Sequence, residues 1–150
     1  MRLHLVLCAA ATALLIPSAI AGTPETIRDR IGGYRAMGAA FKAINDTLRT
    51  DAPDLRVVRR GVRTINMAAH HQYRWFPAGS GPESGQRTKS RAEIWSNAAG
   101  FRTAQDGFAA QARILAAAAR TGDVTAIRAE GRKLGGTCKQ CHDQFRTAND

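Results

Sequence analysis

Apolar residues recur in steps of three and four along most of the chain, which is the spacing of one face of an α-helix. Four segments carry this pattern, and there is almost no strand-like alternation. The first begins at Thr23 and Pro24, a capping residue followed by proline at the first helical position, and it ends before Pro53. The second follows Pro53 and closes at Trp75. The inward face of the first segment comprises Ile27, Ile31, Tyr34, Met37 or Gly38, Phe41, Ile44 and Leu48.

The third helix is expected after a long connection. Residues 77–89 are rich in Gly, Pro and Ser and predict the one long loop. Ser90 follows, with Glu93 three residues on, and this pair matches a capping box. The helix is therefore predicted to begin at Ser90 and to continue to about residue 119.

A short turn at residues 121–123 leads into the fourth helix, with Gly122 at the stop and Asp123 as the next cap. Gly131 lies on the apolar stripe of this helix, where glycine costs about 1 kcal/mol relative to alanine. We therefore expect something bulky to approach closely at Gly131. Four amphipathic helices with two short connections and one longer loop predict an all-α, antiparallel four-helix bundle.

The N-terminal 21 residues have the pattern of a secretory signal peptide. A short basic start precedes a nearly continuous apolar run at residues 5–16, and residues 19–21 form a small-x-small cleavage pattern. The run is shorter than the roughly 20 apolar residues that a membrane-spanning helix needs. We therefore expect cleavage after Ala21, export to the periplasm, and a mature single domain of residues 22–150 that is not inserted in the membrane.

The chain is strongly basic, with 22 basic and 12 acidic residues and a formal net charge of +10. Removal of the signal peptide takes away Arg2 and no acidic residue, leaving 21 against 12, or +9. Such a charge can attract an acidic partner. Nucleic acid is not expected as a partner, because the basic residues are scattered and no aromatic stacking platform accompanies them. Most of the charge is interpreted as solvated helix surface.

The candidate chemistry lies in a Cys-x-x-Cys-His motif at Cys138, Cys141 and His142. Cysteines three apart on a helix project from one face, and each thiol can add across one vinyl group of a porphyrin. A redox dithiol would need a βαβ setting, which the pattern lacks, and zinc would need two more ligands. The motif therefore predicts one covalently attached haem, with the neutral imidazole of His142 as a ligand of its iron.

With this motif close to its C-terminus, the chain resembles the class II c-type cytochromes, the cytochrome c′ group. Residues 143–146 after the motif, residues 93–95, and residues 30–41 in the first helix are also similar. The resemblance implies a four-helix bundle with one covalent haem c and its iron. No enzymatic activity is expected, because the mature sequence has no second metal motif and no recognisable acid–base pair. It also implies that Arg30 approaches a haem propionate.

The family divides on the sixth coordination position of the iron. The position similar to the family's distal residue lies four residues after Arg30 and is Tyr34; a neighbouring register based on Arg35 gives Ala39. Neither is a methionine, so the resemblance implies five-coordinate iron that binds nitric oxide or carbon monoxide in a crowded pocket. Met37 lies three residues from Tyr34, and periodicity alone does not choose between them. With Met37 as sixth ligand, the chain would be a c-556-type electron carrier with an acidic redox partner.

Four positions have two interpretations each. Trp95 and Phe101 are expected to pack against the haem edge or in the core. Arg146 resembles the family's arginine beside the proximal histidine, where it could tune the imidazole, or it is a solvated basic residue near a helix end. Tyr34, if it is not distal, is a core aromatic whose hydroxyl reaches water. Members of this type commonly dimerise through their first two helices, which implies a homodimer.

Overall fold

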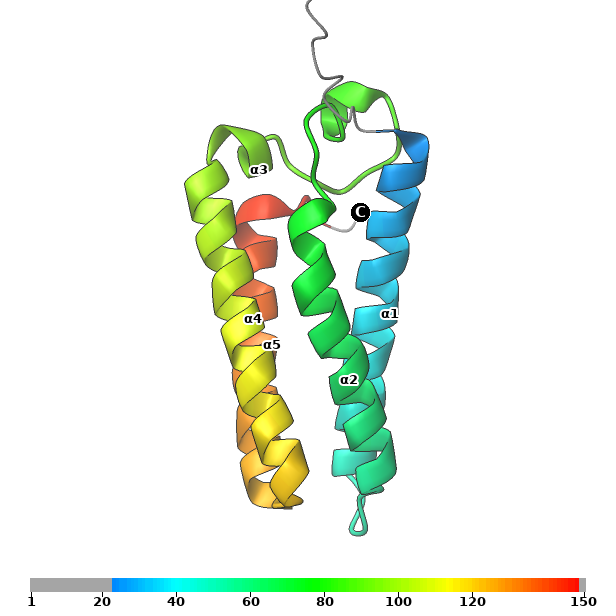
Figure 1. Ribbon diagram of the computed structural model, residues 1–150, viewed down its shortest axis with the longest axis vertical. Helices are drawn as coiled ribbons and strands as arrows, with labels where there is room; N and C mark the ends of the chain where they lie inside the picture. Colours follow the sequence, from blue (N-terminus) through cyan, green and yellow to red (C-terminus); the bar gives the residue numbers. More distant parts are fainter. Residues whose placement is uncertain (1–22, 149–150) are drawn as a thin grey trace, which may run out of the picture.

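The computed structural model describes residues 23–148, so the predicted signal peptide at residues 1–21 lies outside the described residues. The described part is an all-α antiparallel four-helix bundle, as the pattern predicts (Figure 1). Within it, no helix is long and apolar enough to cross a membrane. The elements are α1 (Pro24–Leu48), α2 (Leu55–His71), the 3₁₀ turns η1 (Gln72–Arg74) and η2 (Pro82–Ser84), α3 (Glu93–Ser96), α4 (Ala98–Thr121) and α5 (Val124–Phe145).

Local capping signals are confirmed at two helix starts. The Thr23 side chain accepts a hydrogen bond from the Thr26 backbone N–H at 3.2 Å, and Pro24 occupies the first turn of α1. The Asp123 carboxylate caps α5 by accepting from the backbone N–H groups of Thr125 and Ala126. Gly122 before it has a φ of +80°, the left-handed conformation that favours glycine at a helix end.

The predicted third helix is divided in two, and the capping box proposed for it is wrong. Ser90 forms an isolated antiparallel bridge with Arg146, and Glu93 pairs with Arg91 instead of capping a helix. The short α3 begins at Glu93 without a side-chain cap. Asn97 then breaks the helical path, with φ −120° and ψ 55°, and its side chain caps α4 by accepting from Gly100 N–H at 3.1 Å.

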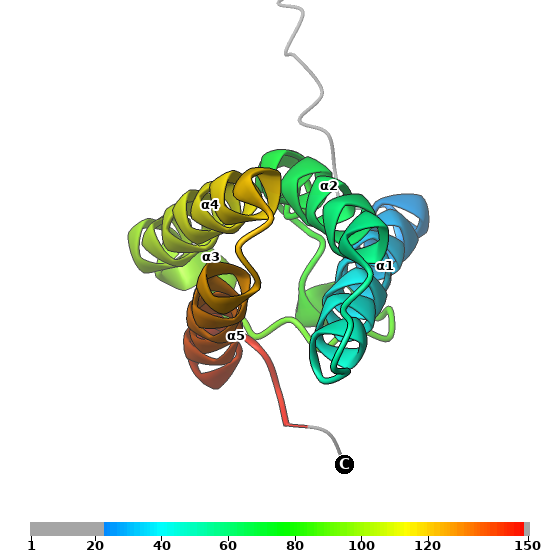
Figure 2. The same cartoon turned by 90° about the horizontal axis from the view of Figure 1, so that it is seen from below.

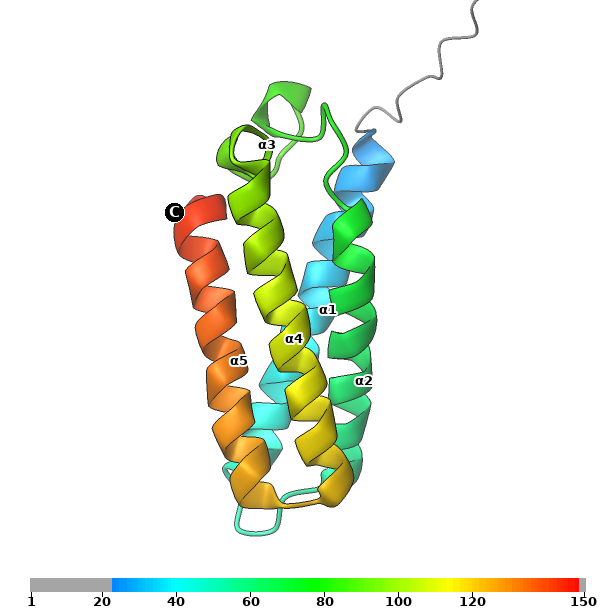
Figure 3. The same cartoon turned by 60° about the vertical axis from the view of Figure 1, so that its left-hand side comes forward.

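The helices pack mainly in sequence order around the bundle. α1 lies against α2, α2 against α4, and α4 against α5, whereas α1 and α5 make far fewer contacts with each other. Figure 2 shows this order from below, and in Figure 3 α5, α4 and α2 are seen from another side. The main core lies toward the end with the α1–α2 and α4–α5 connections; its most buried members are Ile44, Val58, Ile65, Leu115, Ile127 and Leu134.

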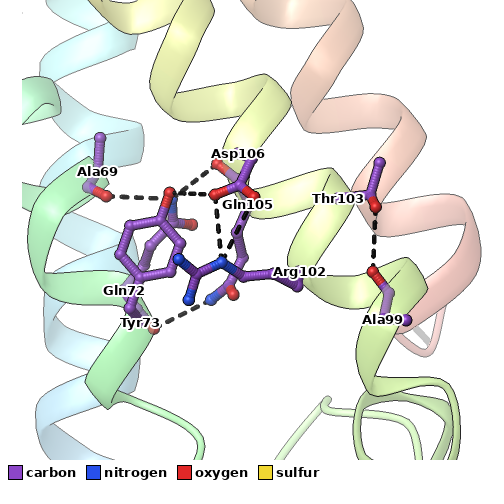
Figure 4. A network of polar contacts seen from close by, with 8 residues as sticks. All are labelled: Ala69, Gln72, Tyr73, Ala99, Arg102, Thr103, Gln105 and Asp106. Carbon is purple, nitrogen blue, oxygen red and sulfur yellow. Dashed lines mark hydrogen bonds and ion pairs between the residues drawn. The ribbon is translucent and has the colours of Figure 1, made fainter.

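A polar network ties the end of α2 to α4 (Figure 4). Gln72 and Gln105, both buried, each donate a side-chain N–H to the other's backbone carbonyl, at 3.2 and 3.1 Å. Beside them, the Tyr73 hydroxyl donates to the Asp106 carboxylate at 2.8 Å, and Arg102 lies 4.2 Å from the centre of the Tyr73 ring. These bonds fix the point where the chain leaves α2 for the long loop.

The close approach expected at Gly131 is not found among the described residues. A Cβ placed there would meet no atom within 4 Å outside its own helix backbone. Close approaches occur at other glycines. A Cβ at Gly61 would lie 2.7 Å from the side chain of Ile44, at the crossing of α1 and α2, and one at Gly33 would overlap the indole of Trp75. These glycines let α2 and the aromatic end of the long loop lie directly against α1.

Candidate haem site

The two cysteines of the motif lie on one face of α5, near its C-terminal end. Both are half-buried, unpaired thiols. Cys138 packs against the main core, whereas Cys141 packs against a second cluster formed by Ile94, Phe101 and Phe145. Burial raises the pKa of both thiols, that of Cys141 to about 11, so both are protonated at neutral pH. The motif thus spans the boundary between the core and an aromatic cluster.

His142 follows Cys141 but has an exposed side chain. Its pKa is lowered, first by partial burial and then by the positive charge of Arg146, against an opposing effect of Asp143. The neutral imidazole that a metal requires is therefore the favoured form at neutral pH. A surface cavity of about 410 Å³ lies at this point, lined by Arg91, His142, Asp143, Arg146, Thr147 and Ala148.

Long-range backbone bonds fix the end of α5. Arg146 N–H donates to the His142 carbonyl at 3.1 Å and ends the helix with an extended backbone. The chain then pairs with the segment before α3: Arg91 N–H donates to the Phe145 carbonyl at 3.0 Å, and Thr147 N–H to the Lys89 carbonyl at 2.9 Å. Arg146 therefore lies just beyond the helix, close enough to His142 for its charge to act on the imidazole.

Tyr34 on α1 lies close enough to this motif for both thiols to affect its pKa. Burial is the first cause of its strongly raised pKa, and the nearby Cys141 and Cys138 thiols raise it further. Its ring packs edge-on against Trp75 at 4.8 Å and lies 6.1 Å from Phe76, measured between ring centres. The phenol is accordingly neutral, held by aromatic neighbours, and close to both cysteines.

Met37 is placed differently from Tyr34. It is half-buried and packs against the main core, the cluster that Cys138 also joins. Tyr34 instead packs against the aromatic rings of Trp75 and Phe76, which follow α2 and η1. The structure thus separates two side chains that helical periodicity leaves equivalent.

An aromatic wall continues from Tyr34 to the end of α5. The ring centres of Phe76 and Phe101 are 4.8 Å apart, and those of Phe101 and Phe145 are 5.1 Å apart. Trp95 lies 6.2 Å from Phe76, and its indole N–H donates to the Pro77 carbonyl at 3.2 Å. Trp95 and Phe101 therefore lie beside Cys141, where they could line a cofactor edge. Sequence reasoning assigned no site role to Trp75, Phe76 or Phe145, although Trp75-Phe76 at a helix end was a visible signal.

Arg30 is buried, with 2% of its surface exposed, and it holds the long loop. One guanidinium nitrogen donates to the Trp75 carbonyl and the Ser80 hydroxyl, and the other to the Ser80 carbonyl and the Thr88 hydroxyl, all at 2.9 to 3.2 Å. The guanidinium also lies 4.7 Å from the centre of the Phe76 ring. No carboxylate of residues 23–148 pairs with it within 4.0 Å. This buried charge is therefore hydrogen-bonded without a direct ion pair, and the Glu83 carboxylate acts on it from a longer distance.

The residues around the motif fit a flat, largely apolar group. Ile31, Tyr34, Met37 and Phe41 point inward in the predicted pattern but remain only half-buried. They lie on α1, which makes few contacts with α5. A Cβ at Gly131 of α5 would also meet open space. A covalently held porphyrin suits this site for three reasons. Apolar side chains are left partly uncovered by protein atoms, two thiols lie on one helical face, and an imidazole lies next to them.

The model of one protein family, described as Cytochrome C′, matches residues 25–146. The chain belongs to the cytochrome c′ family. Among its cytochrome c′ relatives, that of Rubrivivax gelatinosus is 46% identical over 123 residues, covering 81% of this chain and 94% of the relative. That of Alcaligenes xylosoxydans xylosoxydans is 30% identical over 123 residues, covering 81% and 93%.

Solved cytochrome c′ structures have the same fold. The crystal structure from Rubrivivax gelatinosus superposes with a TM-score of 0.75 and 31% identity, covering 81% of this chain and 94% of the other. A nitric oxide complex of a variant from Alcaligenes xylosoxidans gives a TM-score of 0.74 and 27% identity, covering 83% and 95%. Covalent haem c with its iron is the cofactor of this family, which confirms the cofactor that the cysteine motif predicts.

Proposed function

We propose that this cytochrome c′-family chain is a periplasmic protein that binds nitric oxide or carbon monoxide at five-coordinate haem iron and is not an enzyme. The observation that carries the proposal is that Tyr34 of α1 packs against Trp75 and Phe76 and lies close enough to Cys138 and Cys141 for both thiols to affect its pKa. When bound, the haem supplies an iron whose sixth position can take a diatomic gas. Export depends on the predicted signal peptide, which lies outside the described residues.

Cys138 and Cys141 would hold the cofactor through two thioether bonds, and His142 would ligate the iron from the proximal side. The backbone bonds of residues 145–147 fix the end of α5 and so limit where the imidazole can lie. Arg146 lowers the pKa of His142 and helps to keep the imidazole neutral. By analogy with the family, Arg30 would approach a propionate, although both of its terminal nitrogens already donate to Trp75, Ser80 and Thr88.

Tyr34 would restrict access on the distal side. A neutral phenol is a poor iron ligand, and the raised pKa of Tyr34 keeps it neutral. Its contacts with Trp75 and Phe76 limit how far the ring can swing away. The side chain can therefore exclude larger ligands by size while leaving room for diatomic gases.

Carbon monoxide binding to the ferrous protein tests this arrangement. Tyr34→Ala should speed binding by about tenfold, which corresponds to removing about 1.4 kcal/mol of steric barrier. Met37→Ala, one helical turn away, is the matched control and should leave both the rate and the absorption spectrum nearly unchanged. Equal rates for Tyr34→Ala and the unaltered protein would contradict the distal role of Tyr34.

The second candidate is a six-coordinate electron carrier with Met37 as sixth ligand and an acidic redox partner. It is favoured by the contact of both Met37 and Cys138 with one core cluster, and by the net charge of +9 that remains after removal of the predicted signal peptide. A thioether is a reasonable iron ligand. In that case Met37→Ala would convert a low-spin spectrum into a high-spin one, which is the opposite of the control result expected above.

Attachment and assembly have separate tests. Denatured protein should retain one haem on a gel and resist acid–acetone extraction, whereas loss of haem would contradict the thioether assignment to Cys138 and Cys141. A homodimer through α1 and α2 is also proposed, by analogy with the family. Light scattering that gives only the monomer mass at micromolar concentration would refute it.

A further inference from the structure

An arginine-lined groove lies between α2 and α4, outside the haem site. Its volume is about 560 Å³, within the range of small-molecule sites. Figure 1 shows these two helices side by side. The groove lies along residues 59–66 of α2 and 113–120 of α4, away from the end of α5 that carries the cysteines. It is lined by Arg59, Val62, Arg63 and Asn66 of α2 and by Arg113, Ala116, Ala119 and Arg120 of α4.

The hollow follows from the small side chains on its floor. Ala116 and Ala119 face Val62 across the helix pair, and their short side chains leave space that larger residues would fill. Asn66 spans the floor, donating to the Val62 carbonyl at 3.0 Å and to the Ala112 carbonyl at 3.4 Å. The apolar floor is thus closed by packing, and charged groups remain only along the two walls.

Four guanidinium groups form these walls, two from each helix, and no carboxylate lines the groove. All ion pairs found within residues 23–148 involve other basic residues. Arg59 donates through its Nε to the Ala119 carbonyl at 3.4 Å, which leaves its two terminal nitrogens available. Four like charges without acidic partners around one hollow favour an anion.

We propose that this groove binds an anion that bears more than one phosphate group. One guanidinium group donates two parallel hydrogen bonds to two oxygens of a phosphate, a geometry that a lysine ammonium cannot match. Four guanidinium groups line a hollow of about 560 Å³, which is larger than a single phosphate and accommodates a small oligophosphate. The same chemistry could come from a free oligophosphate or from phospholipid headgroups. The groove is distinct from the haem site, so the proposal is independent of gas binding.

Calorimetric titration of the haem-loaded protein with inorganic triphosphate tests the proposal at low ionic strength. The Arg63→Gln/Arg113→Gln variant should lose about tenfold or more in affinity, because it removes one guanidinium from each wall. Arg74→Gln/Arg132→Gln is the matched control: it removes the same charge from exposed positions outside the groove and should change affinity far less. Arg63→Lys/Arg113→Lys keeps the charge but loses the paired geometry, and should fall between the two.

Vesicle sedimentation distinguishes the two phosphate sources. If vesicles of phosphatidylglycerol in phosphatidylcholine bind the unaltered protein and the control but not the groove variant, lipid headgroups are the source. If only triphosphate binding depends on the groove, the source is a free oligophosphate. The proposal is overturned if the unaltered protein binds neither probe, or if the control variant loses as much affinity as the groove variant, since charge alone would then explain binding.

Discussion

Replacement of Arg30 by methionine should detach the long loop from α1. Methionine has a similar length and suits a buried site, so the change removes the hydrogen bonds without opening a large cavity. The native guanidinium contacts Trp75, Ser80 and Thr88, which are 45 to 58 residues away in the chain. The variant therefore tests whether one side chain positions the loop beside Tyr34.

The expected cost follows from the partners that are left behind. The Ser80 hydroxyl still donates to the Pro77 carbonyl, and the Thr88 hydroxyl still accepts from Ser90 N–H, so neither is orphaned. The buried Ser80 carbonyl loses its charged donor at a cost of about 1–3 kcal/mol, and the half-buried Trp75 carbonyl adds about 1 kcal/mol. We expect a total near 3 kcal/mol, or a melting temperature lower by about 10 °C.

Thermal unfolding followed by far-UV circular dichroism gives this number, and hydrogen exchange shows whether amides of residues 75–88 lose protection. Arg35→Met is the control, because Arg35 is exposed on the same helix. Arg30→Lys keeps the charge but not the four bonds, and should be destabilised nearly as much as Arg30→Met. If Arg30→Met and Arg35→Met melt together, with loop protection unchanged, Arg30 does not hold the loop.

The remaining predictions concern stability. Leu115→Ala, at a position with no exposed surface, should cost about 2–5 kcal/mol in chemical unfolding, whereas Ile114→Ala, with 49% of its residue exposed, should cost under about 1 kcal/mol. Equal costs would contradict the assigned core. Lowering the pH should destabilise the protein, because several carboxylates have lowered pKa values in the folded state, so the unfolded chain binds more protons. Their stabilisation is complete above about pH 5 and is lost as the pH falls through the lowered pKa values. A denaturant midpoint at pH 3 equal to that at pH 5 would contradict this. The carboxylates are Glu25, Asp46, Asp54, Glu93 and Glu130.

Features that depend on a few neighbouring residues could be predicted from the sequence. The Thr23 and Asp123 caps, the Gly122 turn and the helical periodicity are local, and the structure confirms them. The cysteine motif is also local, and its cofactor follows from that spacing together with the family. The same local reasoning was wrong at Ser90. Ser90 and Glu93 match a capping-box sequence, but in the structure Ser90 instead forms a backbone bridge with the distant Arg146.

Features that depend on long-range packing could not be predicted. The apolar pattern of residues 94–115 is continuous through Asn97, so it predicts one helix. In the structure the helix breaks at Asn97, and the short α3 before the break packs against the aromatic cluster. The bonds of Arg30 to Ser80 and Thr88 join α1 to a loop of no regular pattern. The basic residues look scattered in sequence, yet the packing of α2 against α4 brings four arginines to one groove.

The absorption spectrum of the ferric and ferrous protein tests the central claim, an open sixth position, most directly. If Tyr34 lies over the iron, as proposed, while Met37 stays in the core cluster, the spectrum should be that of five-coordinate, high-spin haem. It should lack the sharp split bands of a low-spin ferrous cytochrome, and it should change at once when carbon monoxide is added. A low-spin resting spectrum that becomes high-spin in Met37→Ala would contradict the account and make the protein an electron carrier.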